Sequence, residues 1–113
     1  MRGFHTLKNY GEFKRVYEQK DSYANKYLVM YKAPNGLNCG RISYSVSKKV
    51  GNSVVRHRVT RLIRESYRLH KEMFRDGYDV IFVARPLVSD KGYREVESAM
   101  LHLLKMHGWN NKE

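Results

Sequence analysis

The sequence predicts an α+β or α/β sandwich in which helices pack on a single sheet. Three segments repeat apolar residues at helical spacing, two others alternate apolar and polar residues, and residues 78–84 form a nearly continuous apolar run. In chain order these segments read helix, strands, helix, strand, helix. A chain of 113 residues is long enough to bury one modest core. We therefore expect a single domain spanning residues 1–113.

The first helix is predicted over residues 10–20. Asn9 and Glu12 have the spacing of a capping box, which satisfies free backbone N–H groups at the start of a helix. Phe13 and Tyr17 follow one turn apart and share a face. Their rings either pack on the sheet as core residues or face a ligand, and the residues alone leave both interpretations open.

Two strands are predicted over residues 27–32 and 38–46, where side chains alternate with a period of two. The Pro-Asn-Gly sequence at 34–36 is typical of a turn. We therefore expect the two strands to pair as an antiparallel hairpin. One face of the second strand is small and polar, which suits a concave surface that can hold an extended ligand. This face consists of Cys39, Arg41, Ser43 and Ser45.

The next segment is predicted to be an amphipathic helix with turn and cap residues at 51–53 and an end at the Asp-Gly pair 76–77. Its apolar face consists of Val55, Val59, Leu62, Ile63, Ser66, Leu69 and Met73. Its opposite face is basic and consists of His57, Arg61, Arg64, Arg68, Lys71 and Arg75, with Arg56 and Arg58 on the flanks.

The charge of this region is concentrated. Residues 48–75 hold nine of the 22 Lys and Arg residues but only two glutamates, so they carry +7 of the formal net charge of +11. An ordinary solvated helix face would mix both signs, because like charges one turn apart repel. A row of guanidinium groups is typical of a surface that phosphates neutralise. Lys48 and Lys49 extend the charge into a turn that can hold a phosphate. The pattern favours nucleic acid over a membrane surface.

The C-terminal part is predicted to contain one strand and one helix. Residues 78–84 are apolar enough to be buried on both faces. Gly92 and Glu95 have the N-cap and N3 positions of the last helix. Trp109 lies in a tail, residues 108–113, that we expect to fray. The buried stripe of the last helix consists of Val96, Met100, Leu103, Leu104 and His107.

The composition also limits which classes of function we expect. No apolar run approaches the ~20 residues of a membrane span, so we expect no membrane partner. The single cysteine, Cys39, fits a reducing cytoplasm, where we expect the protein to be located. The acidic pairs Asp76/Asp79 and Glu95/Glu97 occupy positions typical of capping carboxylates, and the histidines lack zinc-site spacing. We therefore expect no catalytic residue and no protein-bound metal, as in a binding module.

Residues 45–65, SVSKKVGNSVVRHRVTRLIRE, closely resemble the signature of the bacterial ribonuclease P protein subunit family. That family has a strand ending in Ser-Val-Ser-Lys-Lys, a Gly-Asn turn, and a helix with Arg-Asn-Arg followed by Arg-Leu-Ile-Arg-Glu. Residues 13–17, 29–31 and 79–85 resemble its first helix, its central strand and the strand after the basic helix. His57 stands where the family usually has Asn, so a ring that is partly protonated near neutral pH replaces an amide.

The resemblance implies an α-β-β-β-α-β-α two-layer sandwich similar to domain 2 of ribosomal protein S5. It also implies a left-handed β-α-β crossover, although the general rule for such units predicts a right-handed one.

The resemblance further implies a monomeric protein subunit in a 1:1 complex with the catalytic RNA of ribonuclease P. This holoenzyme removes the 5′ leader of precursor tRNA, and Mg²⁺ held by the RNA supplies the chemistry. The residues expected to bind the catalytic RNA are Lys48, Lys49, Asn52, Arg56, His57, Arg58, Arg61, Arg64 and Arg68. Those expected to form a cleft for the single-stranded leader are Phe13, Lys14, Arg15, Tyr17, Tyr31, Arg41, Ser43 and Ser45.

Two alternatives remain at this point. A ribosomal or general RNA-binding protein of the same fold would need the basic helix, but it gives no reason for aromatic residues that face a polar strand. A helix-turn-helix DNA-binding protein is a weaker alternative, because its recognition helix would need Asn, Gln or Ser to read bases.

Overall fold

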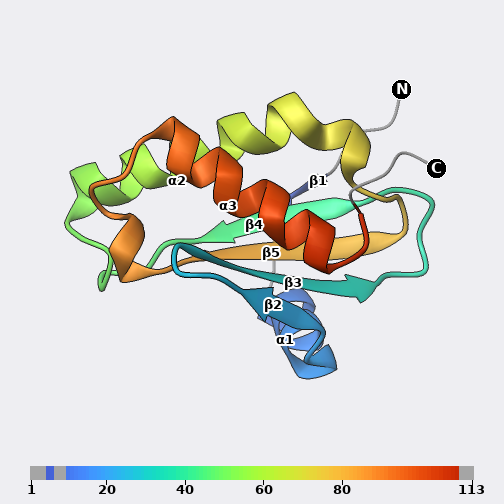
Figure 1. The fold of residues 1–113 in the computed structure, drawn as a ribbon. Coiled ribbons are helices and arrows are strands. Elements are labelled where there is room, and N and C mark those ends of the chain that lie inside the picture. The colour runs from blue at the N-terminus through green and yellow to red at the C-terminus, as the bar shows by residue number, and fades with distance from the viewer. Residues whose placement is uncertain (1–4, 7–9, 110–113) are drawn as a thin grey trace.

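The computed structural model describes residues 5–6 and 10–109, which form one sheet with helices on both faces (Figure 1). The elements are β1 (His5–Thr6), α1 (Tyr10–Gln19), β2 (Ser22–Ala24), β3 (Leu28–Pro34), β4 (Arg41–Ser45), α2 (Ser53–His70), η1 (Lys71–Met73), β5 (Tyr78–Ala84), η2 (Pro86–Val88) and α3 (Tyr93–Met106), where η marks a 3₁₀ turn. The sheet is five-stranded, in the order β1-β4-β5-β3-β2. From α1 onward the helices and strands follow the predicted α-β-β-β-α-β-α order, and the α+β fold class is confirmed.

β5 occupies the centre of the sheet because it pairs along both of its edges. It runs antiparallel to β3, from Leu28 opposite Ala84 to Pro34 opposite Tyr78, and it runs parallel to β4. The predicted hairpin between β3 and β4 is therefore wrong. A strand that is apolar on both faces is stabilised most where neighbouring strands and helices cover it. β5 accordingly inserts between two strands that precede it in the chain.

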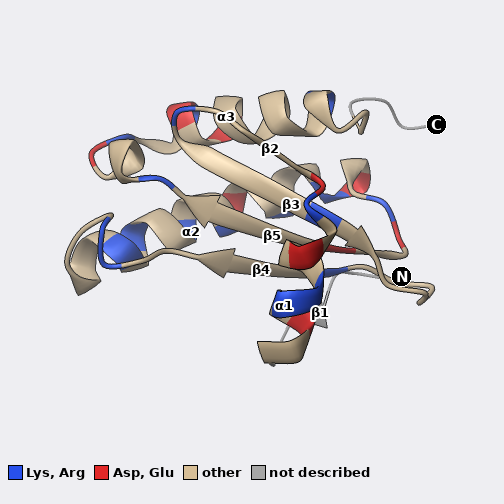
Figure 2. Cartoon of the chain, turned by 90° about the horizontal axis from the view of Figure 1, so that it is seen from below, with Lys and Arg blue, Asp and Glu red and all other residues tan. Residues whose placement is uncertain are grey.

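The connection from β4 through α2 to β5 is left-handed, as Figures 1 and 2 show together. β4 and β5 are adjacent and parallel, and α2 crosses from one to the other on the face that it shares with α3. The handedness implied by the family resemblance is confirmed, and the general preference for right-handed crossovers does not hold here.

The main core lies between the sheet and the layer formed by α2 and α3 (Figure 1). Burying each large apolar side chain in it contributes about 1.5–3 kcal/mol to folding. The fully buried residues of this core are Leu28, Met30, Val59, Ile63, Val80, Phe82, Val88, Val96, Met100, Leu103 and Leu104. α2 is therefore held by the buried face that contains Val59 and Ile63, which leaves its other face to solvent.

α1 packs alone on the opposite face of the sheet (Figures 1 and 2). Val16 is fully buried against Ala33 of β3 and Ile81 of β5. Phe13 and Tyr17 lie around this small cluster and are partly buried. The cluster fixes α1 beside the polar face of β4.

α2 and α3 begin at residues that the sequence predicts. Asn52 is the N-cap of α2, and its side-chain oxygen accepts a hydrogen bond from the backbone N–H of Val55 at 3.0 Å. Gly92 is the N-cap of α3, and its backbone N–H donates to Oε1 of Glu95 at 3.0 Å. The Asn9 cap predicted for α1 lies outside the described residues.

α2 ends at His70 and is followed by η1, which is earlier than the predicted end at residues 76–77. The prediction that Leu69 lies on the buried face is also wrong, because its side chain is 48% exposed. Tyr67 is buried instead, with its ring edge-on to Phe74 at a centroid distance of 5.0 Å. Phe74 follows η1, so the turn brings an aromatic ring under the last turn of α2 that helical periodicity alone does not anticipate.

The end of the described chain is packed rather than frayed. Trp109 is only 3% exposed, and its ring lies edge-on to those of Phe74 and Tyr78. The predicted frayed tail is therefore wrong at Trp109, since a large ring close to an apolar surface gains more by burial than it loses in chain entropy. Residues 110–113 lie outside the described residues.

Candidate nucleic-acid interface

The outer face of α2 is positively charged and solvent-exposed. His57, Arg61 and Arg64 are exposed on successive turns, and Lys48 and Lys49 are exposed in the turn before the helix. Within the described part of the chain, neither Arg61 nor Arg64 forms an ion pair. Charges that the protein leaves unpaired on a rigid helix are available to phosphate groups.

Arg68 differs from its neighbours on this face. Its guanidinium pairs with Glu65 one turn earlier at 2.5 Å, and both side chains are largely exposed. This contact raises the pKa of Arg68 and lowers the pKa of Glu65. An exposed pair of this kind is weak, so the contact with Glu65 does not remove Arg68 from the residues predicted to bind RNA, although it partly neutralises the charge.

Arg56 and Arg58, on the flanks of α2, bind backbone carbonyl groups of the protein. Arg56 Nη1 donates to the carbonyl oxygen of Gly51 at 2.9 Å. Arg58 Nη1 donates to that of Lys91 at 2.8 Å, and its Nη2 donates to that of Ser89. These bonds fix both side chains without neutralising their charge. Arg58 thereby joins the loop before α3 to the basic face.

A hollow of about 780 Å³ runs along this face of α2. It is lined by Val54, His57, Arg58, Thr60, Arg61 and Arg64. Arg64 also lies 6.0 Å from the centre of the Tyr44 ring of β4. Burial raises the pKa of Tyr44 to about 12, so its phenol stays protonated and uncharged beneath the guanidinium group.

The predicted aromatic residues meet on the other face of the sheet. Phe13, Tyr17 and Tyr31 are half-buried around the small cluster beneath α1. The rings of Tyr17 and Tyr31 are edge-on at 4.7 Å. Burial raises the pKa of the Tyr17 phenol, while a hydrogen bond with Ser45 opposes this shift. The three rings are thus neither sealed in the core nor free in solvent, and they adjoin Ser45 and the buried Ser43 of β4.

A buried carboxylate organises the basic residues on this face. Asp79, at the start of β5, is 0% exposed and accepts two hydrogen bonds of 2.8 Å from the Arg41 guanidinium. It also binds the Arg15 guanidinium and accepts from Nδ2 of Asn35 at 2.8 Å. Arg41 pairs in addition with Glu12 of α1 at 2.7 Å. These contacts, chiefly the hydrogen bonds to Asp79, raise the pKa of Arg41.

The predicted cleft residues therefore fall into two groups. Phe13, Tyr17, Tyr31 and Ser45 come together beneath α1, and Ser43 is buried on β4 opposite Ile81 of the same cluster. The basic residues are engaged elsewhere, since Arg15 and Arg41 are matched by acids of the same chain and Lys14 is exposed beside Glu18 at 3.4 Å. Figure 2 shows basic and acidic segments together on α1 and next to it.

Asp79 and Glu12 have structural roles that differ from the helix and turn capping that their local sequence predicts. The signal that could have identified Asp79 is its position inside an otherwise apolar strand, where an unpaired carboxylate would be costly to bury. Its partners come from α1 and β4, which no local pattern joins to it.

The described residues contain no group of three or more His, Cys, Asp and Glu side chains that could hold a metal ion. Among the same residues, no helix combines the length and apolar character needed to cross a membrane.

Comparison with known proteins identifies the family. The profile of the family described as Ribonuclease P matches residues 1–108. This chain belongs to the ribonuclease P protein family. It is 50% identical to the ribonuclease P protein component of Alkaliphilus oremlandii, over 93% of this chain and 92% of the relative. It is 54% identical to that of Lachnoclostridium phytofermentans, over 90% and 88% of the two chains.

Solved structures of the family share its fold. The ribonuclease P protein of Staphylococcus aureus superposes with a TM-score of 0.85 at 32% identity, covering 95% of this chain and 98% of that one. The protein from Thermotoga maritima gives a TM-score of 0.80 at 25% identity, covering 90% and 96%. The chain is accordingly an RNA-binding protein component of the ribonuclease P holoenzyme, the endoribonuclease of tRNA processing whose chemistry the RNA subunit carries. Family membership decides against the ribosomal and DNA-binding alternatives.

Proposed function

We propose that the two faces of the sheet bind two different parts of the ribonuclease P substrate complex. α2 and the turn before it hold the catalytic RNA. The rings beneath α1 and the polar side chains of β4 hold the single-stranded 5′ leader of precursor tRNA. The protein acts as a monomer in a 1:1 cytoplasmic complex, and Mg²⁺ for the reaction is bound by the RNA.

The observation that carries this proposal is the pair of exposed guanidinium groups of Arg61 and Arg64, which form no ion pair with any described residue, on a helix whose apolar face is buried. Keeping two like charges this close costs folding energy unless a ligand neutralises them. Lys48, Lys49 and His57 add to the same face. Arg56 and Arg58, whose guanidinium groups are already oriented by backbone carbonyls, can present their remaining N–H groups to the same phosphates.

The leader assignment is supported by the half-buried rings of Phe13, Tyr17 and Tyr31. Single-stranded RNA is bound by stacking of bases on aromatic rings, at about 1–3 kcal/mol per base. Ser45 and the Tyr17 phenol provide polar groups beside the rings for the sugar-phosphate backbone. Arg15 and Arg41 are held by Asp79, so they define the wall of this cleft more than they supply free charge.

The decisive experiment compares two substrates with two groups of variants. Phe13→Ala and Tyr31→Ala should weaken binding of precursor tRNA by the holoenzyme about tenfold for each lost base stack, and they should leave binding of mature tRNA unchanged. The double variant Arg61→Ala/Arg64→Ala should instead weaken binding of the catalytic RNA. Tyr31→Phe, which keeps the ring, serves as the matched control.

Urea unfolding of each variant establishes that the loss arises from the surface and not from misfolding. Equal losses for precursor and mature tRNA in the Phe13 and Tyr31 variants would contradict the leader cleft while leaving the role of α2 intact.

A further inference from the structure

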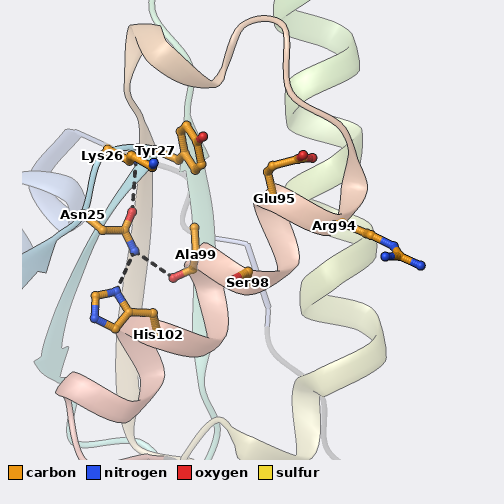
Figure 3. Close-up of a pocket in the computed structure, with 8 residues that line it drawn as sticks. All are labelled: Asn25, Lys26, Tyr27, Arg94, Glu95, Ser98, Ala99 and His102. Carbon is orange, nitrogen blue, oxygen red and sulfur yellow. Dashed lines mark hydrogen bonds between the residues drawn. The ribbon is translucent and has the colours of Figure 1, made fainter.

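A pocket of about 420 Å³ lies between the β2–β3 turn and the first half of α3 (Figure 3). Its size is that of a small-molecule site. It is lined by Asn25, Lys26, Tyr27, Arg94, Glu95, Ser98, Ala99 and His102. None of these residues belongs to the basic face of α2 or to the cleft beneath α1, so the functions already described do not account for it.

The backbone around the pocket is held in place because Asn25 uses both ends of its amide, whereas the lysine side chains are not fixed by these bonds. Its Oδ1 accepts hydrogen bonds from the backbone N–H groups of Tyr27 at 3.1 Å and Leu28 at 3.0 Å. Its Nδ2 donates to the carbonyl oxygen of Ala99 at 3.0 Å and faces Nδ1 of His102 at 3.3 Å. The turn is thereby locked onto α3, as Figure 3 shows. A pocket that is formed in advance does not lose conformational entropy when a ligand enters.

The pocket combines an aromatic ring, a carboxylate and cationic side chains, and the carboxylate of Glu95 is exposed. Nζ of Lys26 lies 5.2 Å, and Nζ of Lys91 lies 5.9 Å, from the centre of the Tyr27 ring. Glu95 uses Oε1 to cap α3, and its second oxygen forms no hydrogen bond with the described residues. A carboxylate repels a phosphate but accepts hydrogen bonds from the amino group of a base. The lysines attract a phosphate, whose binding would draw them from the ring and leave its face free for stacking.

The pocket is joined to the basic face of α2 through Arg58. Its guanidinium binds the carbonyl groups of Ser89 and Lys91, and the Lys91 side chain reaches the Tyr27 ring. Lys91 Nζ also lies 3.6 Å from Oδ1 of the exposed Asp90. An exposed pair of this kind is weak, so a phosphate can compete with Asp90 for the Lys91 ammonium, and the 89–91 loop connects α2 to the pocket through Arg58 and Lys91. α1 lies on the opposite face of the sheet from α3 (Figure 1), so the pocket is separate from the ring cluster beneath α1.

We propose that this pocket receives one unpaired nucleotide of the catalytic RNA, with its base stacked on Tyr27 and its phosphate bound by Lys26 and Lys91. The inference rests on the proposed role of α2. RNA that is bound along α2 would pass residues 89–91 before it reaches the pocket. It adds a third contact with RNA, of a different kind from the phosphate contacts of α2.

The test measures the affinity of the full chain for ribonuclease P RNA at fixed salt concentration. Tyr27→Ala should weaken binding about tenfold, the effect of one lost base stack, and Tyr27→Phe should not. Because Tyr27 also packs against the core, Ser98→Trp provides a second variant, which fills the pocket from an exposed helix position and should have the same effect.

Lys26→Ala should weaken binding about threefold, the loss of one phosphate contact. Lys105→Ala, which removes the same charge from an exposed site of α3 outside the pocket, is the control and should bind within about twofold of the wild type.

Ultraviolet cross-linking of the assembled complex, followed by mass spectrometry, should attach an RNA nucleotide to the peptide that contains Tyr27. Free AMP should compete poorly for this cross-link, because it lacks the contacts made by α2. Efficient binding of AMP at the pocket without any cross-link to RNA would identify a free nucleotide as the ligand and overturn the inference.

If Tyr27→Ala and Ser98→Trp both bind ribonuclease P RNA with unchanged affinity while Arg61→Ala/Arg64→Ala binds it more weakly, nucleotide binding in the pocket is contradicted and the proposed function is still supported. Unchanged affinity of the Arg61/Arg64 variant would contradict the proposed function and remove the basis for the pocket with it.

Discussion

At the scale of single residues, the position of Asp79 determines how α1 is attached to the sheet. Its carboxylate is fully buried and binds Arg15 of α1, Arg41 of β4 and Asn35 of the β3–β4 connection. A buried charge is tolerated only when its partners satisfy it. Here the partners come from three separate segments, so one side chain connects them.

We expect Asp79→Asn to lower the free energy of unfolding by about 3 kcal/mol, because it leaves the Arg41 guanidinium partly buried without its main counter-charge. Urea unfolding followed by circular dichroism measures the change. Glu65→Gln is the control, since Glu65 pairs with Arg68 at the surface and its loss should leave the free energy of unfolding nearly unchanged. A midpoint for Asp79→Asn equal to that of the control would show that the network is not needed for stability.

The helix caps could be predicted from the sequence, whereas the structural role of Asp79 could not. Asn52, Gly92 and Glu95 were predicted as caps because a cap depends on neighbours within one helical turn. The role of Asp79 depends on Arg15 and Arg41, which are distant in sequence, and local spacing carries no information about such partners.

At the scale of elements, α2 combines a buried apolar face with an exposed cationic one. The apolar face fixes its orientation, because Val59 and Ile63 are fully buried in the main core. The cationic face then presents Arg61 and Arg64 in fixed positions. Binding to the phosphates of a folded RNA by such an element should depend strongly on salt, because each contact releases counterions.

We expect the affinity for the catalytic RNA to fall with salt at a slope of about −4 to −5 in a plot of log K against log salt concentration, for about six phosphate contacts. Arg61→Ala/Arg64→Ala should make this slope shallower by about 2, one for each lost contact. Filter binding over a series of salt concentrations provides both values. A double variant with the wild-type slope would mean that these two guanidinium groups do not contact phosphates.

The elements themselves were largely predictable, whereas their pairing was not. The alternation in β3 and β4 and the apolar run of β5 are local properties, and the strands lie where these patterns place them. The predicted hairpin between β3 and β4 is wrong because both strands pair with β5 instead. β5 comes later in the chain, after α2, so the local pattern of β3 and β4 does not reveal this pairing. The burial of Trp109 was missed for a similar reason, since its partners Phe74 and Tyr78 lie more than 30 residues earlier in the chain.

At the scale of the whole molecule, the two proposed RNA-binding surfaces lie on opposite faces of one sheet (Figure 1). α2 and α3 cover one face and α1 covers part of the other. The family resemblance was needed to predict the left-handed crossover that produces this arrangement, because the general physical preference has the opposite sign.

We expect the two surfaces to act independently. Phe13→Ala should leave the affinity for the catalytic RNA unchanged, and Arg61→Ala should leave the affinity for precursor tRNA unchanged once the holoenzyme is saturated with protein. The combined variant should show both single losses, each within about twofold, as for separated sites that share no partners. A combined loss larger by tenfold or more would reveal energetic coupling through the sheet.

The continuous pairing of β3 and β4 along both edges of β5 leaves no hinge between these surfaces. If the two proposed surfaces bind the catalytic RNA and the leader, the sheet sets the distance between them before either molecule binds. Under this proposal, accommodation of leaders that differ in sequence depends on rotation of the Phe13, Tyr17 and Tyr31 rings, and a change in the distance between the surfaces would require a different arrangement of the strands.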